Sequence, residues 1–176
     1  MNKISIILIA IVIVAAGIWF YLNYYKIPSE LKSFDDCVKA GYPIMESYPR
    51  QCKVPDGEVF TEDIGNELEK TDLIMIDSPR PNERIESPWQ IKGRARGSWF
   101  FEATFPIKLL DKDGNVLAST EAQAQGEWTT NDFVLFKAEL KFSATSDEKG
   151  TLILEKSNPS DLPQNADQLR VPVVFK

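Results

Sequence analysis

The chain of 176 residues contains no histidine and only two cysteines, Cys37 and Cys52. Histidine is the usual general base of enzymes and a common zinc ligand, so its absence excludes Ser-His-Asp and Cys-His catalysis and histidine-ligated zinc sites. We therefore expect neither an enzyme nor a cofactor or metal centre. The chain also lacks a strongly basic block and an aromatic-basic RNA-binding motif, so we expect no nucleic acid partner.

One long apolar run stands at the amino terminus. Residues 4–22, ISIILIAIVIVAAGIWFYL, carry no charge and end in aromatic side chains. At about 1.5 Å of rise per residue, such a helix spans the roughly 30 Å of a membrane's hydrocarbon core. A cleaved signal peptide is the alternative, because Val14-Ala15-Ala16 resembles a cleavage site. Since the apolar run continues past that site, we expect residues 1–26 to anchor the chain in the cell membrane, with residues 27–176 extracytoplasmic.

Residues 27–62 have the features of a small α+β module. Ser33 is placed to cap a short helix over residues 34–40, with an acidic partner three residues later. An extended run over residues 44–54 follows, and the turn Pro55-Asp56-Gly57 leads into a short strand. The following residues 63–72, DIGNELEKTD, are acidic and poor in strand formers, which predicts a linker with one helical turn.

Cys37 and Cys52 fall within this module. In an exported chain, two cysteines at this separation most simply form one disulfide, which would stabilise a small unit by roughly 3 kcal/mol. A reduced catalytic thiol and a metal pair are the alternatives. The first lacks a histidine to activate it, and the second lacks third and fourth ligands.

Residues 73–176 show the period-two alternation of β-strands. From Trp99 to Leu109, the odd positions are apolar, which predicts a strand over residues 99–111 with one buried face. A tight turn over residues 112–115, KDGN, then predicts a hairpin. The side chains expected to face inward on its second arm are Val116, Ala118, Thr120, Ala122 and Ala124. One further strand segment, 89–96, precedes this hairpin. Three more follow it, at 134–142, 151–155 and 169–175. With LIMID at 73–77, about seven short strands result, and their spacing predicts an all-β, immunoglobulin-like antiparallel sandwich.

Several of these segments carry a recognisable combination of residues. The motifs are Ser78-Pro79, Ser87-Pro88, Ile91-x-Gly93-x-Ala95, Phe101-Glu102-Ala103, Leu109-x-Asp111, Asp113-Gly114 and Gly150-Thr151-Leu152. In this combination, residues 73–176 resemble the GerM-associated immunoglobulin-like domain of bacterial spore-germination proteins. The preceding two-cysteine run resembles a module of uncharacterised bacterial envelope proteins. The resemblance implies an extracytoplasmic, non-catalytic module.

Some residues break the expected pattern. Phe100, Phe133 and Leu135 are apolar at positions where a solvated sheet face would carry polar side chains, as are Leu110 and Leu117. Gathered together, such side chains form an interface, unless a long connection of the chain itself covers them.

Other aromatic and charged side chains suggest ligand sites. Trp128, beside a turn, is the aromatic side chain best placed to stack on a sugar. Arg94 and Arg96 alternate with apolar residues, so we expect them to face solvent and not to form an anion site. The run from Asp111 to Asn115 imitates a calcium loop, but its sixth and twelfth positions are wrong for one, which favours a plain turn.

These observations predict a membrane-anchored extracytoplasmic interaction module that is not catalytic. The alternative is a cell-wall glycan-binding protein. An envelope protein or a cell-wall glycan is the expected partner, alongside the membrane contacted by residues 4–22. The sequence does not identify that partner, and it leaves open the oligomeric state, a role in germination and cleavage of the N-terminal segment.

Overall fold

A computed structural model describes residues 3–24, 31–146 and 148–176, with side chains in the first range described for residues 11–21. The chain divides into two compact units, Met1–Glu62 and Asp63–Lys176. The first residues of the predicted module, 27–30, lie outside the described residues, as does Asp147 in the predicted turn before β10.

The amino-terminal run forms helix α1 (Lys3–Tyr24). Within the part of the chain that the structure describes, none of the helices meets the requirements of length and apolar character for crossing a membrane. The anchor predicted at residues 4–22 stays a prediction.

The remainder of the first unit is a helix beside a small sheet. Helix α2 (Phe34–Lys39) begins at Ser33, whose hydroxyl oxygen accepts the Asp36 amide and donates to the Asp36 carboxylate. This confirms the predicted cap. The strands β1 (Ile44–Met45), β2 (Gln51–Lys53) and β3 (Val59–Thr61) pair antiparallel in that order. The extended run predicted over residues 44–54 is wrong in its middle, because the chain reverses between β1 and β2.

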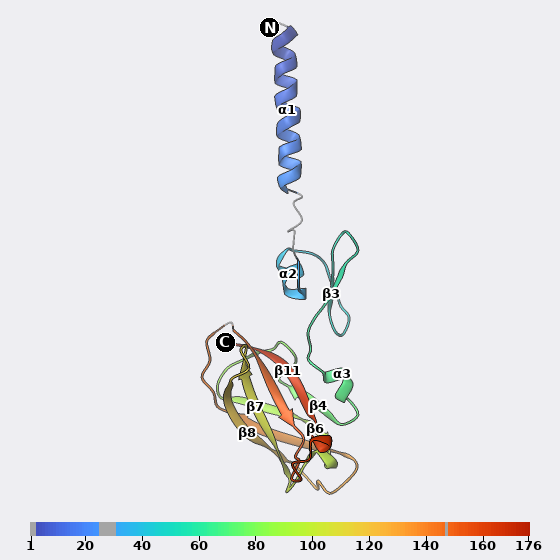
Figure 1. Cartoon of the computed structure of the whole chain (residues 1–176), viewed down its shortest axis with the longest axis vertical. Helices are drawn as coiled ribbons and strands as arrows, with labels where there is room; N and C mark the ends of the chain where they lie inside the picture. The colour runs from blue at the N-terminus through green and yellow to red at the C-terminus, as the bar shows by residue number, and fades with distance from the viewer. Residues whose placement is uncertain (1–2, 25–30, 147) are drawn as a thin grey trace. The chain divides into compact units, whose positions relative to one another are not determined.

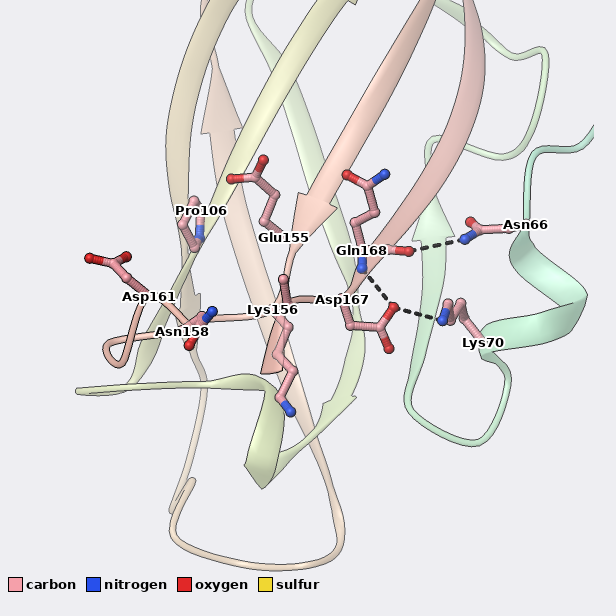
Figure 2. Close-up of a pocket in the computed structure, with 10 residues that line it drawn as sticks. Asn66, Lys70, Pro106, Glu155, Lys156, Asn158, Asp161, Asp167 and Gln168 are labelled. Carbon is pink, nitrogen blue, oxygen red and sulfur yellow. Dashed lines mark hydrogen bonds and ion pairs between the residues drawn. The ribbon is translucent and has the colours of Figure 1, made fainter. Parts of the chain in front are cut away.

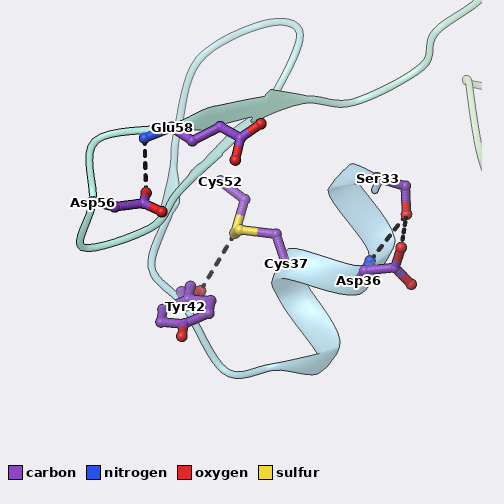
Figure 3. The surroundings of a disulfide bond; sticks show 7 residues. All are labelled: Ser33, Asp36, Cys37, Tyr42, Cys52, Asp56 and Glu58. Atoms are coloured by element: carbon purple, nitrogen blue, oxygen red, sulfur yellow. Dashed lines mark hydrogen bonds between the residues drawn. A yellow bond between two sulfur atoms is a disulfide. The ribbon is translucent and has the colours of Figure 1, made fainter. Parts of the chain in front are cut away.

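The predicted disulfide joins α2 to β2 (Figure 3). Cys37 and Cys52 are fully buried, with Cα atoms 6.1 Å apart, and they pack with Phe34 and Val54 in a core separate from that of the second unit. The Cys52 sulfur lies 3.9 Å from the Tyr42 carbonyl oxygen. Because a bridged sulfur carries no proton, this is a packing contact and not a hydrogen bond.

The second unit contains an eight-stranded sheet in the order β4-β6-β9-β8-β7-β10-β11-β5. Its strands are β4 (Ile74–Ser78), β5 (Arg84–Ile85), β6 (Trp89–Arg96), β7 (Thr104–Asp111), β8 (Val116–Ala124), β9 (Phe133–Leu140), β10 (Lys149–Glu155) and β11 (Gln168–Phe175). All neighbours pair antiparallel except β11 and β5, which are parallel. The short helices are α3 (Glu67–Lys70), η1 (Gly97–Trp99) and η2 (Pro163–Asn165).

The sheet curls around one core (Figure 1). The alternation predicted for β6, β9 and β11 is confirmed, since every second side chain from each strand is buried in this core. Strands from both halves of the sheet supply it, among them Ile74 from β4 and Leu154 from β10. The predicted sandwich is therefore built from one continuous sheet that curls over itself. Among the described side chains, neither core contains one from residues 11–21.

Gly93 on β6 makes the close packing of this core possible. A Cβ atom at this position would lie 2.6 Å from the Phe136 ring and 2.3 Å from the Met75 carbonyl oxygen. The ring of Phe136 therefore occupies the space that any other side chain would need. Phe136 in turn packs edge-on against Phe105, with ring centroids 4.9 Å apart.

The strand predicted from Trp99 begins only at Thr104. Residues 97–99 form η1, and Glu102 and Ala103 have positive φ values of 50° and 63°, which interrupt an extended strand. Without alternation, Trp99 and Phe100 are both buried, while Phe101 is exposed. On the second arm of the hairpin, Val116 was predicted to face inward but is exposed, because the register shifts beside the turn.

Residues 63–72, predicted as a linker, carry helix α3 and belong to the second unit. The Asn66 side chain holds the segment on β11. Its Nδ2 donates to the Gln168 carbonyl oxygen at 3.0 Å, and its Oδ1 accepts the Arg170 amide at 2.7 Å. Ile64 is buried beside these contacts.

Candidate functional site

Two shallow hollows divide the four residues predicted to form an interaction surface. Phe100 and Trp128 line one hollow, and Phe133 and Leu135 line the other. Phe100 is buried and packs edge-on against Phe105 with a centroid distance of 5.2 Å, so its assignment to an exposed surface is wrong. Phe133 is half-buried and Leu135 is exposed, both on the outer side of β9. The two β9 residues therefore remain as surface candidates.

Trp128 is half-buried against the core of the second unit, so its ring is only partly exposed for stacking on a sugar. Beside it lies a shallow hollow of about 330 Å³, lined also by Ser98 and Thr129. A second hollow of about 380 Å³ lies next to Phe133 and Leu135. Both are open and small, so neither encloses a ligand.

The outer side of strands β6 and β9 has the most distinctive chemistry of the described surface. We define the β6–β9 face as Lys92, Arg94 and Arg96 on β6 with Phe133, Leu135 and Lys137 on β9. The sheet register places these residues in opposite pairs. Lys92 lies opposite Lys137, Arg94 opposite Leu135, and Arg96 opposite Phe133. Opposite residues share one side of a sheet, so the six side chains form one surface.

The four cations of this face have no salt bridge within the described residues. Arg94 Nη2 lies 3.3 Å from the Met75 sulfur, which is a weak acceptor. The Arg96 guanidinium lies 4.1 Å above the Phe133 ring and donates to the backbone carbonyls of Asp72 and Asn131. Sequence reasoning predicted Arg94 and Arg96 to face solvent, but it did not show that Lys137 joins them.

A polar hollow in the second unit has a volume of about 680 Å³ (Figure 2). Its charged side chains are largely paired. Lys70 Nζ lies 2.6 Å from an Asp167 oxygen, and Glu155 accepts from Lys108 at 2.8 Å. The other lining residues are Asn66, Pro106, Lys156, Asn158, Asp161, Ala166 and Gln168. Such a hollow offers hydrogen bonds to a polar ligand, and no aromatic side chain lines it among the described residues.

The hairpin turn that imitates a calcium loop uses its carboxylate internally. Asp111 accepts hydrogen bonds from the amides of Asp113 and Asn115 and from the Asn115 side chain. The Asn115 side chain contributes most to lowering the pKa of Asp111, and the backbone amides add to it. Residues 112–115 form the turn between β7 and β8, as the sequence predicts. In the described ranges, no cluster of three or more potential metal-binding side chains is found.

Comparison with known proteins agrees with the fold of the second unit. Residues 73–162 match the model of a family described as the immunoglobulin-like domain of bacterial spore germination. The two-cysteine module lies outside the matched residues. No curated protein and no solved structure matches the chain.

Proposed function

We infer the function from the fold and its family: the chain belongs to the immunoglobulin-like domains of bacterial spore germination, and we propose that it is a non-catalytic interaction module of the bacterial cell envelope. In this proposal, its amino-terminal helix anchors it in the cell membrane. Residues 27–176 lie outside the cytoplasm and bind a partner through the second unit.

The β6–β9 face gives the main support for this proposal. A solvated sheet face ordinarily mixes charges of both signs, and cations directly opposite each other destabilise a sheet. Here Lys92 and Lys137 oppose each other, and Leu135 is exposed on the same strand as Lys137. Within the described residues, the cations of this face form no salt bridge, and a surface with such cations and an exposed leucine has the character of a binding surface.

The amino acid sequence supports the anchor and the location. Residues 4–22 carry no charge, and helix α1 (Lys3–Tyr24) includes all of them. The buried Cys37–Cys52 disulfide suits an oxidising compartment outside the cytoplasm.

Fractionation of cells that express the full chain tests this proposal. We expect the chain to stay in membranes after alkaline extraction, while external protease digests residues 31–176 in spheroplasts. A variant that lacks residues 2–24 serves as the control and should be absent from membranes after the same alkaline extraction. Release of the full chain by alkali, or its protection from external protease, would contradict the anchor or its orientation.

The polar hollow of Figure 2 favours a second candidate, a cell-wall glycan-binding protein, because its amide and carboxylate groups can bond to sugar hydroxyls. A pull-down of residues 31–176 on peptidoglycan tests it, with Asn158→Ala in the hollow and Trp128→Ala outside it. Loss of binding in Asn158→Ala alone would support the hollow. Loss in Trp128→Ala alone would favour stacking on that ring, and an unbound wild type would eliminate this candidate.

A further inference from the structure

Leu135 lies at the centre of the cations on the β6–β9 face. Arg94 is directly opposite it on β6. Lys137 lies two residues after Leu135 on β9 and is opposite Lys92. Phe133 lies two residues before Leu135, beneath the Arg96 guanidinium. Leu135 is 59% exposed, so an apolar side chain projects into solvent with a positive charge on each side.

The carboxylates at the border of the face do not neutralise its four cations. Glu139 is 3.1 Å from Lys141 and accepts a hydrogen bond from Gln90. Asp77 on β4 and Asp132 before β9 make no salt bridge to the four cations in the described part of the chain. The face is therefore cationic although the whole chain has a net charge of −6.

We propose that the β6–β9 face binds the surface of an anionic phospholipid membrane. The four cations meet lipid phosphates, and Leu135 enters the boundary between headgroups and acyl chains. This inference deepens the proposed function, on which it rests, by naming the partner of the second unit. An amino-terminal anchor would hold the second unit close to such a surface and so raise its effective concentration there.

The exposed leucine distinguishes a lipid surface from a soluble polyanion. A hydrophilic polymer of phosphodiester groups would attract the cations equally well but would leave Leu135 in water. A membrane offers both phosphate charge and an apolar layer within reach of one flat face. Binding to lipid must therefore depend on the cations and on Leu135 together.

Co-sedimentation of residues 31–176, which contain all the described residues of both cores, with lipid vesicles tests the proposal. We expect binding to phosphatidylcholine vesicles that contain phosphatidylglycerol, little binding to pure phosphatidylcholine, and weaker binding as salt screens the charges. Arg94→Gln with Lys137→Gln should lower the partition coefficient about 30-fold, because each basic residue near an anionic surface raises the affinity for it about fivefold. Lys39→Gln with Lys53→Gln, exposed in the first unit, removes the same charge and should change it little.

Leu135→Ser should lower the partition coefficient about tenfold without a change in net charge. Its matched control is Val116→Ser, since Val116 is 58% exposed but lies at the hairpin turn, away from the face. Thermal melting of each variant establishes that it remains folded.

Three results would overturn the proposal. The first is no binding to anionic vesicles, and the second is binding that neither the cation variant nor Leu135→Ser weakens. The third is equal binding to soluble poly(glycerol phosphate) with no effect of Leu135→Ser, which would assign the face to a soluble polymer. Because the fragment lacks residues 1–30, its failure to bind vesicles would leave the anchor untouched, and a failed alkaline extraction would leave the vesicle result untouched.

Discussion

Lys92 on β6 and Lys137 on β9 occupy directly opposite positions in the antiparallel register, with their side chains on the outer side of the sheet. Neither forms a salt bridge within the residues that the structure describes. A pair of like charges in this position destabilises a sheet, whereas opposite charges stabilise it. The Lys92–Lys137 pair therefore lowers the stability of the sheet, but it offers two neighbouring positive charges to an anion.

Reversing one charge of this pair is expected to stabilise the second unit. Lys137→Glu should raise the free energy of unfolding by roughly 0.2–1 kcal/mol, because an opposite-charge pair replaces a like-charge pair. Lys92→Glu should have the same effect, and the double variant should lose it, as a double-mutant cycle in urea denaturation would show. If both single variants destabilise the protein, the two side chains do not interact across the strands.

Gly93→Ala is expected to destabilise the second unit by about 1–3 kcal/mol, because the added methyl group overlaps the Phe136 ring and the Met75 carbonyl. Gly126→Ala is the matched control, since a Cβ atom there has no neighbour within 4 Å. Urea denaturation of both variants measures the difference. Equal stabilities would mean that the core accommodates the methyl group without strain.

The strands of the second unit could largely be predicted because their alternation is strict. Ile91 and Ala95 on β6, like Val171 and Val173 on β11, follow the period of two and are buried as expected. The prediction failed where the backbone leaves that period. At Glu102 and Ala103 positive φ values break the strand, so the phase assigned to Phe100 from the strand pattern was wrong.

The disulfide is expected to stabilise the first unit alone, by about 3 kcal/mol for the 15 residues that separate its cysteines. Reduction should therefore increase hydrogen exchange in residues 34–61 and leave the strands of the second unit protected. The double variant Cys37→Ser with Cys52→Ser should show the same increase, and added reductant should not change it further. Faster exchange throughout β6 and β9 after reduction would show that the units do not unfold independently.

Asp111 is expected to stabilise the hairpin turn only while it is ionised. Hydrogen bonds lower its pKa below the ordinary value of 3.8, so its stabilising effect is full above that pH and is lost as the pH falls through the lowered pKa. The difference in melting temperature between wild type and Asp111→Ala should therefore shrink in acid. A difference for Asp111→Ala that stays constant down to strong acid would contradict this role.

The candidate surface could be predicted only in part. The sequence identifies Leu135 and Phe133 as apolar residues in outward positions, and Arg94 and Arg96 as outward cations. It does not place the two sets together, because β6 and β9 are separated by two other strands in the chain and become neighbours only through the order of the sheet. Strand order depends on long-range pairing, which the alternation of a single strand does not encode.

Site-specific photocrosslinking in living cells identifies directly what the β6–β9 face contacts. A photoreactive side chain is placed at position 135 of the full chain, and a second variant carries it at position 116 as the equally exposed control. We expect phospholipid adducts at position 135 and few at position 116, with the difference reduced by Arg94→Gln and Lys137→Gln. Adducts at position 135 to a protein or a wall polymer in place of lipid, or equal lipid adducts at both positions, would contradict the proposed membrane binding.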